Sequence, residues 1–228
     1  MKKRQTQMII GVLVGLVLIA VAICAFTLLL DNSDPLYGGH TVEAWREQLN
    51  SHDQTGSNQA YLIVSGSIIP QLMDKMVHDT NDAQFKLSAV KLLNSLPGIH
   101  VKFMDANLRR SQATYAIGEM GLAAKSAIPK LIQAVNGPDT VVREPAIISI
   151  GRIRCDPDLV IPLLLHLLDD KNLNDDAAMA LGYFGGLSKA AIPKLTLMLH
   201  APDKDDRHAA REALKMIDSA GATQAGLR

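Results

Sequence analysis

The chain has 228 residues, with 23 lysines and arginines against 23 aspartates and glutamates, and only 4% of its residues are aromatic. This balance excludes the basic bias that nucleic-acid-binding domains usually carry, so we expect no nucleic acid among the partners. Two cysteines, Cys24 and Cys155, exclude a disulfide framework within one chain. Abundant Ala, Leu and Ile with few aromatics is typical of thin helices packed by small side chains.

The N-terminal part combines a basic segment with an apolar run. Residues 1–7 carry three basic side chains, and residues 8–30 form a stretch of 23 residues without a charge. As a helix, this stretch would be about 35 Å long, enough to cross a hydrocarbon core of about 30 Å. We therefore expect a transmembrane helix over residues 8–30 that contacts the lipid bilayer. The positive-inside rule then predicts a single-pass protein of a bacterial inner (plasma) membrane, with residues 1–7 cytoplasmic and the remainder extracytoplasmic.

Two alternatives compete for the same stretch. Ala20-Val21-Ala22 resembles the small-x-small site of a cleaved signal peptide, although the apolar run continues to Leu30. Val21 to Cys24 resembles a lipoprotein cleavage box, with a bulky Ile23 just before the cysteine. Within the run, Gly11 and Gly15 form a G-x-x-x-G pattern, which predicts a homodimer through close helix packing.

Residues 31–57 are predicted to form a linker and a short capping helix. The segment up to His40 is polar and contains Pro and Gly, which favours a loop. Thr41 is a candidate N-cap for a helix with Val42, Trp45 and Leu49 on one face. We expect Trp45 to cover the open end of the following repeats, with a membrane-interface role as the alternative.

Residues 58–218 are organised around an internal repeat. The segments from Ala113, Ala146 and Ala177 share an alternation of small and apolar residues that ends on a glycine. The aligned positions lie 33, 31 and 33 residues apart, and a period of that size predicts a stacked-repeat architecture. These aligned positions are Gly118, Gly151, Gly182 and Lys215.

An Ile-Pro pair follows each of the first three aligned glycines by ten residues, and its prolines are Pro129, Pro162 and Pro193. Proline suits only the first turn of a helix, so each pair predicts the start of a second helix. Apolar residues recur after each pair with the 3.6-residue period of a helix that buries one face. The predicted fold is all-α, an α-solenoid of helical hairpins preceded by the single transmembrane helix.

Two rows of charged residues recur with the same period. The acidic row comprises Asp139, Asp170 and Asp203, and the basic row comprises Arg110, Arg143 and Arg207. An Asp in a turn can accept from free N–H groups at a helix start, and an Arg one turn later can reach the Asp of a neighbouring unit. We expect a structural ladder rather than a ligand site.

The repeat is less regular at its two ends. Residues 60–64 and 69–77 resemble a degenerate first helical pair, and residues 84–96 a further first helix whose partner is shortened or lost after Pro97-Gly98. The predicted count is about four and a half repeats. Residues 219–228 are small and polar, and we expect a flexible tail.

The pattern D-x-x-x-[VR]-R-x-x-A-x-x-A-[IL]-G-x-x-G, followed by A-[AI]-x-x-x-A-I-P-x-L, resembles the HEAT-like repeats of the phycobilin-lyase type. The resemblance covers Asn107 to Asp218 well and Asn58 to Leu96 loosely. It implies helical pairs that form a curved surface, which in such proteins mostly binds other proteins.

No group of residues in the sequence predicts chemistry. The seven histidines form neither H-x-x-x-H nor H-E-x-x-H, the spacings that place two metal ligands on one helical face. Some HEAT-like proteins are iron hydroxylases with paired His-Glu motifs, and no His here precedes a Glu. Phosphate-binding and nucleophile-elbow motifs are also missing. We expect no catalytic residue, no metal site and no cofactor.

The predicted second helices also have an outward face. Six residues at their outward positions form a mixed apolar and basic strip that we expect to bind a partner. These residues are Lys130, Gln133, Leu163, His166, Lys194 and Leu197. Contact with a neighbouring helix is the alternative role for them.

The sequence as a whole favours a membrane-anchored, non-enzymatic scaffold that holds an unidentified protein partner on its concave face. The alternative, implied only by the resemblance, is a lyase or lyase chaperone that handles a tetrapyrrole or another prosthetic group. A structural spacer or self-assembling dimer is a third possibility.

Overall fold

The computed structural model describes Gly11, Gly15 and residues 35–82, 84–95 and 103–218 of the protein. Within these residues the regular structure is helical, apart from one isolated β-bridge between Tyr37 and His40. The all-α class predicted from the sequence is therefore confirmed for this part of the chain. The chain divides into two compact units, one of residues 1–35 and 80–106 and one of residues 36–79 and 107–228.

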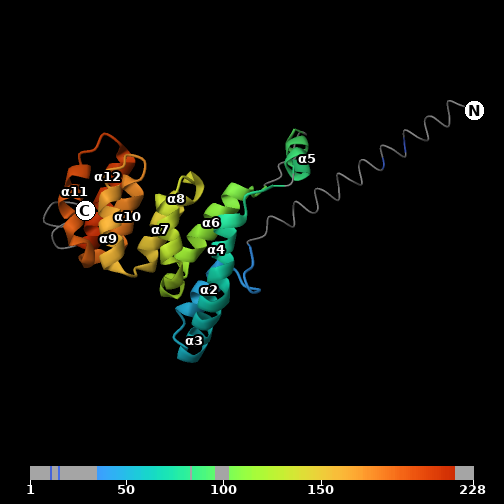
Figure 1. Ribbon diagram of the computed structural model, residues 1–228, viewed down its shortest axis with the longest axis horizontal. Coiled ribbons are helices and arrows are strands. Elements are labelled where there is room, and N and C mark those ends of the chain that lie inside the picture. The colour runs from blue at the N-terminus through green and yellow to red at the C-terminus, as the bar shows by residue number, and fades with distance from the viewer. Residues whose placement is uncertain (1–10, 12–14, 16–34, 83, 96–102, 219–228) are drawn as a thin grey trace, which may run out of the picture. The chain divides into compact units, whose positions relative to one another are not determined.

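The larger unit contains a stack of helical hairpins in which first and second helices alternate (Figure 1). The first helices α8, α10 and α12 contact one another in succession, and each second helix packs beside a first helix. The first helices are α6 (Ala106–Glu119), α8 (Thr140–Ile153), α10 (Asn174–Tyr183) and α12 (Lys204–Ile217), and the second helices are α7 (Ile128–Asn136), α9 (Pro157–Leu167) and α11 (Ile192–Met198).

The aligned glycines lie where successive first helices approach most closely. A Cβ at Gly118 would lie 2.7 Å from the Cα of Ser149, and a Cβ at Gly151 would lie 2.7 Å from the Cα of Ala180. Gly182 repeats this arrangement against Ala213, at 3.0 Å. Each glycine thus faces the residue two positions before the aligned position of the next repeat. The physical reason for these glycines is the close approach of two helix backbones.

The joints between first and second helices take two forms. Gly121 and Gly185 have positive φ angles of 54° and 56° and open the 3₁₀ segments Gly121–Ala127 and Gly185–Ala191. As predicted, α7 and α11 then begin at their Ile-Pro pairs.

The middle joint breaks this rule. Arg154 and Asp156 adopt positive φ angles of 53° and 50°, and α9 begins at Pro157. The prediction that Pro162 marks a helix start is wrong, because Pro162 lies inside α9. Pro157 takes the first helical position, where its fixed φ angle suits a helix, and the backbone N–H groups of Leu159 and Val160 both donate to the Asp156 oxygen at 3.0 Å.

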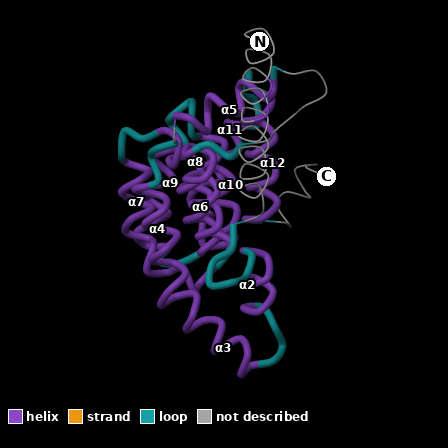
Figure 2. Tube along the Cα trace, turned by 90° about the vertical axis from the view of Figure 1, so that its right-hand side faces the viewer, coloured by secondary structure: helices purple, strands orange, loops and turns teal. Residues whose placement is uncertain are grey.

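The first part of the larger unit is one continuous helical run instead of a pair of helices. It comprises α3 (Gln54–Ile63), a π-helical turn (Val64–Ile68) and α4 (Ile69–His78), as Figure 2 shows. Pro70 has no N–H group and would break an α-helix at this point. In the π turn the N–H of Ile69 reaches the oxygen of Val64, five residues back, and the wider turn accommodates the proline.

Helix α2 (Val42–Leu49) packs against this run. Thr41 caps it by accepting from the Ala44 N–H, and Trp45 is buried with its indole N–H donating to the Tyr37 oxygen at 2.7 Å. Arg46 on the same helix pairs with Glu119 at the end of α6, at 3.2 Å. The only tryptophan therefore belongs to the core at this end of the stack.

Helix α4 packs directly against α6. Arg109 donates from Nε and Nη2 to the two carboxylate oxygens of Asp79, at 2.8 and 2.7 Å. The hydrogen bonds from Arg109 hold the pKa of Asp79 below its ordinary value. The intervening helix α5 (Gln84–Asn94) belongs to the other compact unit, so the prediction that residues 84–96 provide a first helix of this stack is corrected.

The predicted localisation in a membrane is also wrong. In the residues that the structure describes, no helix is long and apolar enough to cross a bilayer. The run 8–30, on which the prediction rested, lies outside the described residues except for Gly11 and Gly15, as do residues 1–7 and 219–228. Dimerisation through Gly11 and Gly15 stays a prediction.

Candidate functional site

The six residues of the predicted strip lie on the three second helices of the stack. Lys130 and Gln133 belong to α7, Leu163 and His166 to α9, and Lys194 and Leu197 to α11. Four of them, Lys130, Gln133, His166 and Leu197, are exposed. Leu197 has 74% of its surface accessible, the highest fraction among the large hydrophobic residues that the structure describes.

Two members of the strip contact the neighbouring helix instead. Leu163 is partly buried and packs against the core. The Lys194 ammonium group donates to the Leu165 oxygen at 3.0 Å and pairs with Asp169 at 2.7 Å, which joins α11 to α9 and the turn after it. The alternative role, contact between helices, therefore describes these two residues.

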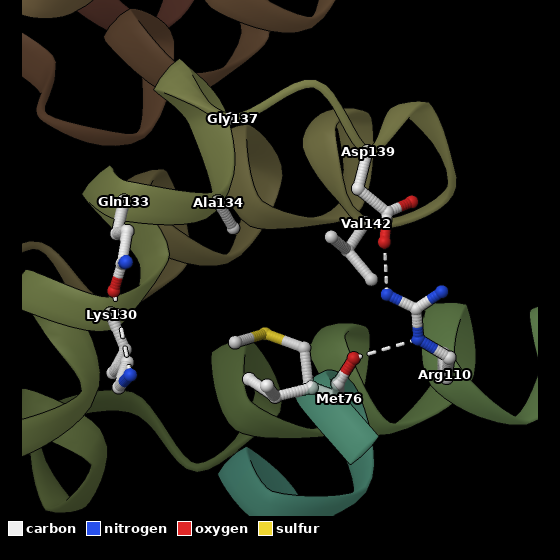
Figure 3. A pocket seen from close by; sticks show the side chains of 9 residues that line it. Met76, Arg110, Lys130, Gln133, Ala134, Gly137, Asp139 and Val142 are labelled. Atoms are coloured by element: carbon white, nitrogen blue, oxygen red, sulfur yellow. Dashed lines mark hydrogen bonds and ion pairs between the residues drawn. The ribbon is translucent and has the colours of Figure 1, made fainter. Parts of the chain in front are cut away.

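A pocket of about 230 Å³ opens at the α7 end of the strip. Figure 3 shows it between α4, α6, α7 and the start of α8. Its apolar part comes from helices of different repeats, and its polar part includes two strip residues and one pair from the charged rows. The lining residues are Met76, Val77, Arg110, Lys130, Gln133, Ala134, Gly137, Asp139 and Val142.

Arg110 forms one wall of the pocket and is 7% exposed. Its Nε donates to the Met76 oxygen of α4 at 2.8 Å, and its Nη2 forms an ion pair with Asp139 (Figure 3). Asp139 also caps α8, because its other carboxylate oxygen accepts from the Val141 N–H at 3.1 Å. Arg110 thus connects α4, α6 and α8, and its charge is balanced within the wall.

Lys130 stands on the rim of the same pocket. Its ammonium group contacts the Gln133 side-chain oxygen, one turn along the same helix, at 3.4 Å. That distance is at the long end for a hydrogen bond, and the acceptor carries no charge. The rim therefore presents a cation that forms no ion pair with a carboxylate of the described residues, in contrast to Arg110.

The two charged rows behave differently along the stack. Arg143 and Arg207 donate to backbone oxygens of the turns just before their own helices, namely Gly137 for Arg143 and Ala201, Pro202 and Asp203 for Arg207. Only Arg110, within the described residues, reaches the Asp of the next repeat. Asp203 caps α12 through the Asp205 N–H at 2.8 Å, and Asp170 accepts from the Asn172 N–H at 3.0 Å.

A second pocket, of about 400 Å³, lies between α2 and α3. Trp45, Ala60 and Ile63 supply its apolar surface, and His40 packs edge-on against the Trp45 ring with centroids 4.9 Å apart. The side chains of Gln48, Ser51, Asp53 and Gln59 supply polar groups. The sequence analysis did not predict this pocket. The one signal for it was the only Trp of the chain on a short amphipathic helix, which was interpreted as a cap over the repeats.

Comparison with known proteins identifies the repeat. The family model described as HEAT repeats matches residues 104–182 and, in a second overlapping match, residues 128–215. Residues 104–215 are HEAT-like repeats. The resemblance to HEAT-like repeats drawn from the sequence is therefore confirmed for this part of the chain.

One solved structure shows a similar fold. The complex of CpcE and CpcF of phycocyanin lyase from Nostoc sp. PCC7120 is similar with a TM-score of 0.50 and 20% identity, covering 83% of this chain and 68% of that chain. An engineered protein is similar with a TM-score of 0.40 and 20% identity, covering 80% of each chain. No curated protein matches the sequence.

The HEAT-like repeats bring one group of titratable side chains together. Burial, followed by the neighbouring Asp175 and Glu144, raises the pKa of Asp176 from its ordinary value of 3.8 to about 7. Asp176 lies one turn before Ala180, where α10 approaches Gly151 of α8, and Glu144 belongs to α8. The close approach of the two helices thus places two carboxylates near each other.

The described residues contain no group of three or more His, Cys, Asp or Glu side chains that is suited to hold a metal ion. Cys155 is a buried free thiol, and burial together with the nearby Asp156 raises its pKa. A raised pKa lowers the fraction of reactive thiolate, so Cys155 has the character of a structural thiol. The described residues therefore offer two pockets and an exposed row of second helices as candidate binding surfaces.

Proposed function

We propose that the HEAT-like stack is a non-enzymatic module that binds another protein along its second helices α7, α9 and α11. The observation that carries this proposal is the pocket of about 230 Å³ beside the exposed Lys130, on the same row of helices as Leu197. Small-molecule sites usually occupy about 300 to 1,000 Å³, so this pocket suits one anchoring side chain of a partner better than a whole ligand.

Apolar anchors and surrounding polar contacts are the usual composition of a protein interface. Leu197 supplies an exposed apolar group, and His166 lies on the helix between Leu197 and the pocket. Stacked repeats hold such groups in fixed positions, because each repeat is packed against its neighbours. A partner would therefore meet a surface with little ordering entropy left to lose.

A capture experiment tests this proposal. The tagged full chain, a Leu197→Asp variant and a Leu122→Asp variant are used to recover proteins from extracts of the native cells. Leu122 is a matched control, because it is 63% exposed but lies in the joint Gly121–Ala127, outside the strip. We expect partners that are lost with Leu197→Asp and retained with Leu122→Asp. Equal recovery by all three proteins would remove the support for this surface.

The second candidate function is a subunit or chaperone of a lyase that handles a tetrapyrrole or a similar prosthetic group. The likeness to the CpcE and CpcF complex of phycocyanin lyase supports this candidate at least as well as the first. The pocket of about 400 Å³ between α2 and α3 also falls within the size range of small-molecule sites, and it includes aromatic and polar side chains.

Tryptophan fluorescence separates the two candidates. Trp45 is the only tryptophan of the chain and lines this pocket, so a bound open-chain tetrapyrrole would quench its emission by energy transfer. The lyase-like candidate predicts saturable quenching on titration with biliverdin, weakened by Ile63→Glu in the pocket wall. Emission that stays unchanged up to high micromolar biliverdin would contradict it.

A further inference from the structure

We infer that the pocket beside Lys130 receives an apolar side chain from a segment of the partner that also carries an Asp or Glu next to that side chain. This inference rests on the proposed protein-binding function and specifies the chemistry of the partner. It follows from the floor, the charge and the size of the pocket.

The floor of the pocket is apolar. Met76 and Val142 are buried beneath it, while Val77 remains 38% exposed and Ala134 is partly exposed. At about 30 Å³ per molecule, roughly eight waters would fill the volume of 230 Å³. An apolar group that displaces poorly ordered water from such a floor gains affinity. The floor therefore selects an apolar side chain.

The charge of the lining favours a negative neighbour. The pocket has two cations, Arg110 and Lys130, and one anion, Asp139, so its net charge is 2 − 1 = +1. Arg110 and Asp139 neutralise each other within the wall. The remaining charge is that of Lys130, which is exposed at the rim and contacts only the neutral Gln133 in the pocket. A carboxylate placed at the rim would meet this ammonium group without displacing an existing ion pair.

Other occupants fit less well. A free small anion would occupy an apolar floor without replacing the hydrogen bonds it made to water, which costs free energy. A nucleic acid would need a wider basic surface, whereas Asp139 and the neighbouring turn 168–170 contribute carboxylates. A C-terminal carboxylate would satisfy Lys130 equally well, so the experiment uses segments that lack one.

Selection from a library of random linear peptides tests the inference. The peptides are displayed with protein on both sides, so that no free C-terminus is present, and the immobilised full chain is the bait. We expect enrichment of an apolar residue with Asp or Glu within a few positions of it. With Lys130→Glu as the bait, we expect Lys or Arg to replace the acidic residue.

An enriched peptide then serves as a labelled probe in fluorescence anisotropy. Reversal of a charge at an interface rim predicts a loss of affinity of about tenfold for Lys130→Glu. The matched control Lys189→Glu reverses an exposed lysine in the joint Gly185–Ala191 and should change affinity less than about twofold, because exposed charges outside the contact contribute little. Ala134→Trp, which fills the pocket, should abolish binding. Unchanged circular dichroism of each variant verifies the fold.

Three results would overturn the inference. The first is the absence of an enriched motif, the second is enrichment without an acidic residue, and the third is equal affinity for wild type and Lys130→Glu. If partner capture still depends on Leu197 in any of these cases, the proposed protein-binding function stands and only the pocket assignment fails. If capture is also unaffected by Leu197→Asp, both fail.

Discussion

Two regions of the HEAT-like stack obey different rules. Where successive first helices meet, the structure repeats the same contact three times, with Gly118, Gly151 and Gly182 against the backbone of the next helix. At the joints between first and second helices, by contrast, segments of equal length adopt two conformations. Gly121 and Gly185 open 3₁₀ segments, whereas the segment from Arg154 leads directly into α9 at Pro157.

This difference shows which part of the repeat tolerates variation. A Cβ added at one of these glycines would lie only 2.7 to 3.0 Å from a Cα of the next helix, so sterics fix the residue as glycine. A joint has to reverse the direction of the chain and to cover the core with a buried side chain. Both the 3₁₀ segments and the turn from Arg154 into α9 meet these two requirements. Ala127 and Ala191 at the ends of the 3₁₀ joints are buried, and so is Val160 at the corresponding position, which here lies in the first turn of α9.

The largest effect is expected at a glycine of the stacked face. Gly151→Ala places a Cβ 2.7 Å from the Cα of Ala180, and since a backbone atom cannot move aside cheaply, we expect a loss of about 3 kcal/mol in the free energy of unfolding. Urea denaturation measures this loss. The matched control is Gly186→Ala in a joint, where nothing lies within 4 Å, and a change within about 0.5 kcal/mol is expected there. Equal losses would contradict the distinction between the two regions.

The stacked face also predicts a dependence on pH. Because the folded pKa of Asp176 is about 7 and its ordinary value is 3.8, the folded state binds the proton more tightly than the unfolded state. The contribution of Asp176 to the free energy of unfolding should therefore be greatest below about pH 4 and should be lost as the pH rises to about 7. Partial exposure and the position of Asp176 in the first turn of α10 reduce the effect, so we expect Asp176→Asn to be more stable than wild type by about 1 to 2 kcal/mol at pH 8.

Urea titrations at pH 4, 6 and 8 check this dependence. Asp176→Asn should match wild type at pH 4 and exceed it at pH 8. Asp206→Asn removes a carboxylate from the same position of α12 and should leave the wild-type slope between pH 4 and 7 in place. The raised pKa of Asp176 would be refuted if Asp176→Asn were no more stable than wild type at pH 8, or if it were more stable by the same amount at pH 4 and pH 8.

At the joints, a comparison between repeats predicts a gain. Ser188 is fully buried in the joint Gly185–Ala191, and its hydroxyl has no hydrogen-bond partner in the described part of the chain. Ala124 occupies the same position of the joint Gly121–Ala127 and is equally buried. Removing an unsatisfied buried hydroxyl should raise the free energy of unfolding by about 1 kcal/mol in Ser188→Ala. The reciprocal change, Ala124→Ser, should lower it. A thermal melt in which both variants shift stability in the same direction would disprove the equivalence of the joints.

The smallest effect is expected at Arg154, a residue other than glycine at the left-handed position that Gly121 and Gly185 occupy elsewhere. Glycine at position 154 would relieve the strain of the left-handed conformation but would also increase the entropy of the unfolded chain. We therefore expect Arg154→Gly to raise the free energy of unfolding by about 0.5 to 1 kcal/mol. Arg154→Ala keeps the Cβ and should give no gain. Denaturation of both variants compares them directly, and the same stability in both would show that the backbone there is unstrained.

The sequence predicted the regular part of the fold because its signals are local. Ile-Pro pairs at the first turn predicted where α7 and α11 begin, and the 3.6-residue period predicted buried faces. The same rule failed at Pro162, because Pro157 five residues earlier competes for the helix start. At Pro70 the helix α4 does begin at the Ile-Pro pair, but a π turn joins it to α3 without a break, which the sequence did not predict.

The candidate site was only partly predictable for a different reason. Periodicity identified Lys130, Gln133, His166 and Leu197 as outward-facing, and these four are exposed. It did not distinguish Lys194, whose partners on α9 and in the following turn depend on the packing of two helices. The pocket required α4 to lie beside α6, and no local pattern indicates that residues 80–106 belong to the other compact unit.

The central claim is that the second helices, rather than the first helices, form the binding surface. Site-specific photo-crosslinking in native cells tests it most directly, with p-benzoylphenylalanine in place of Gln133 on α7 or of the exposed Arg211 on α12. The account predicts a discrete adduct with one protein from position 133 and none from position 211. An adduct from position 211 alone would contradict it.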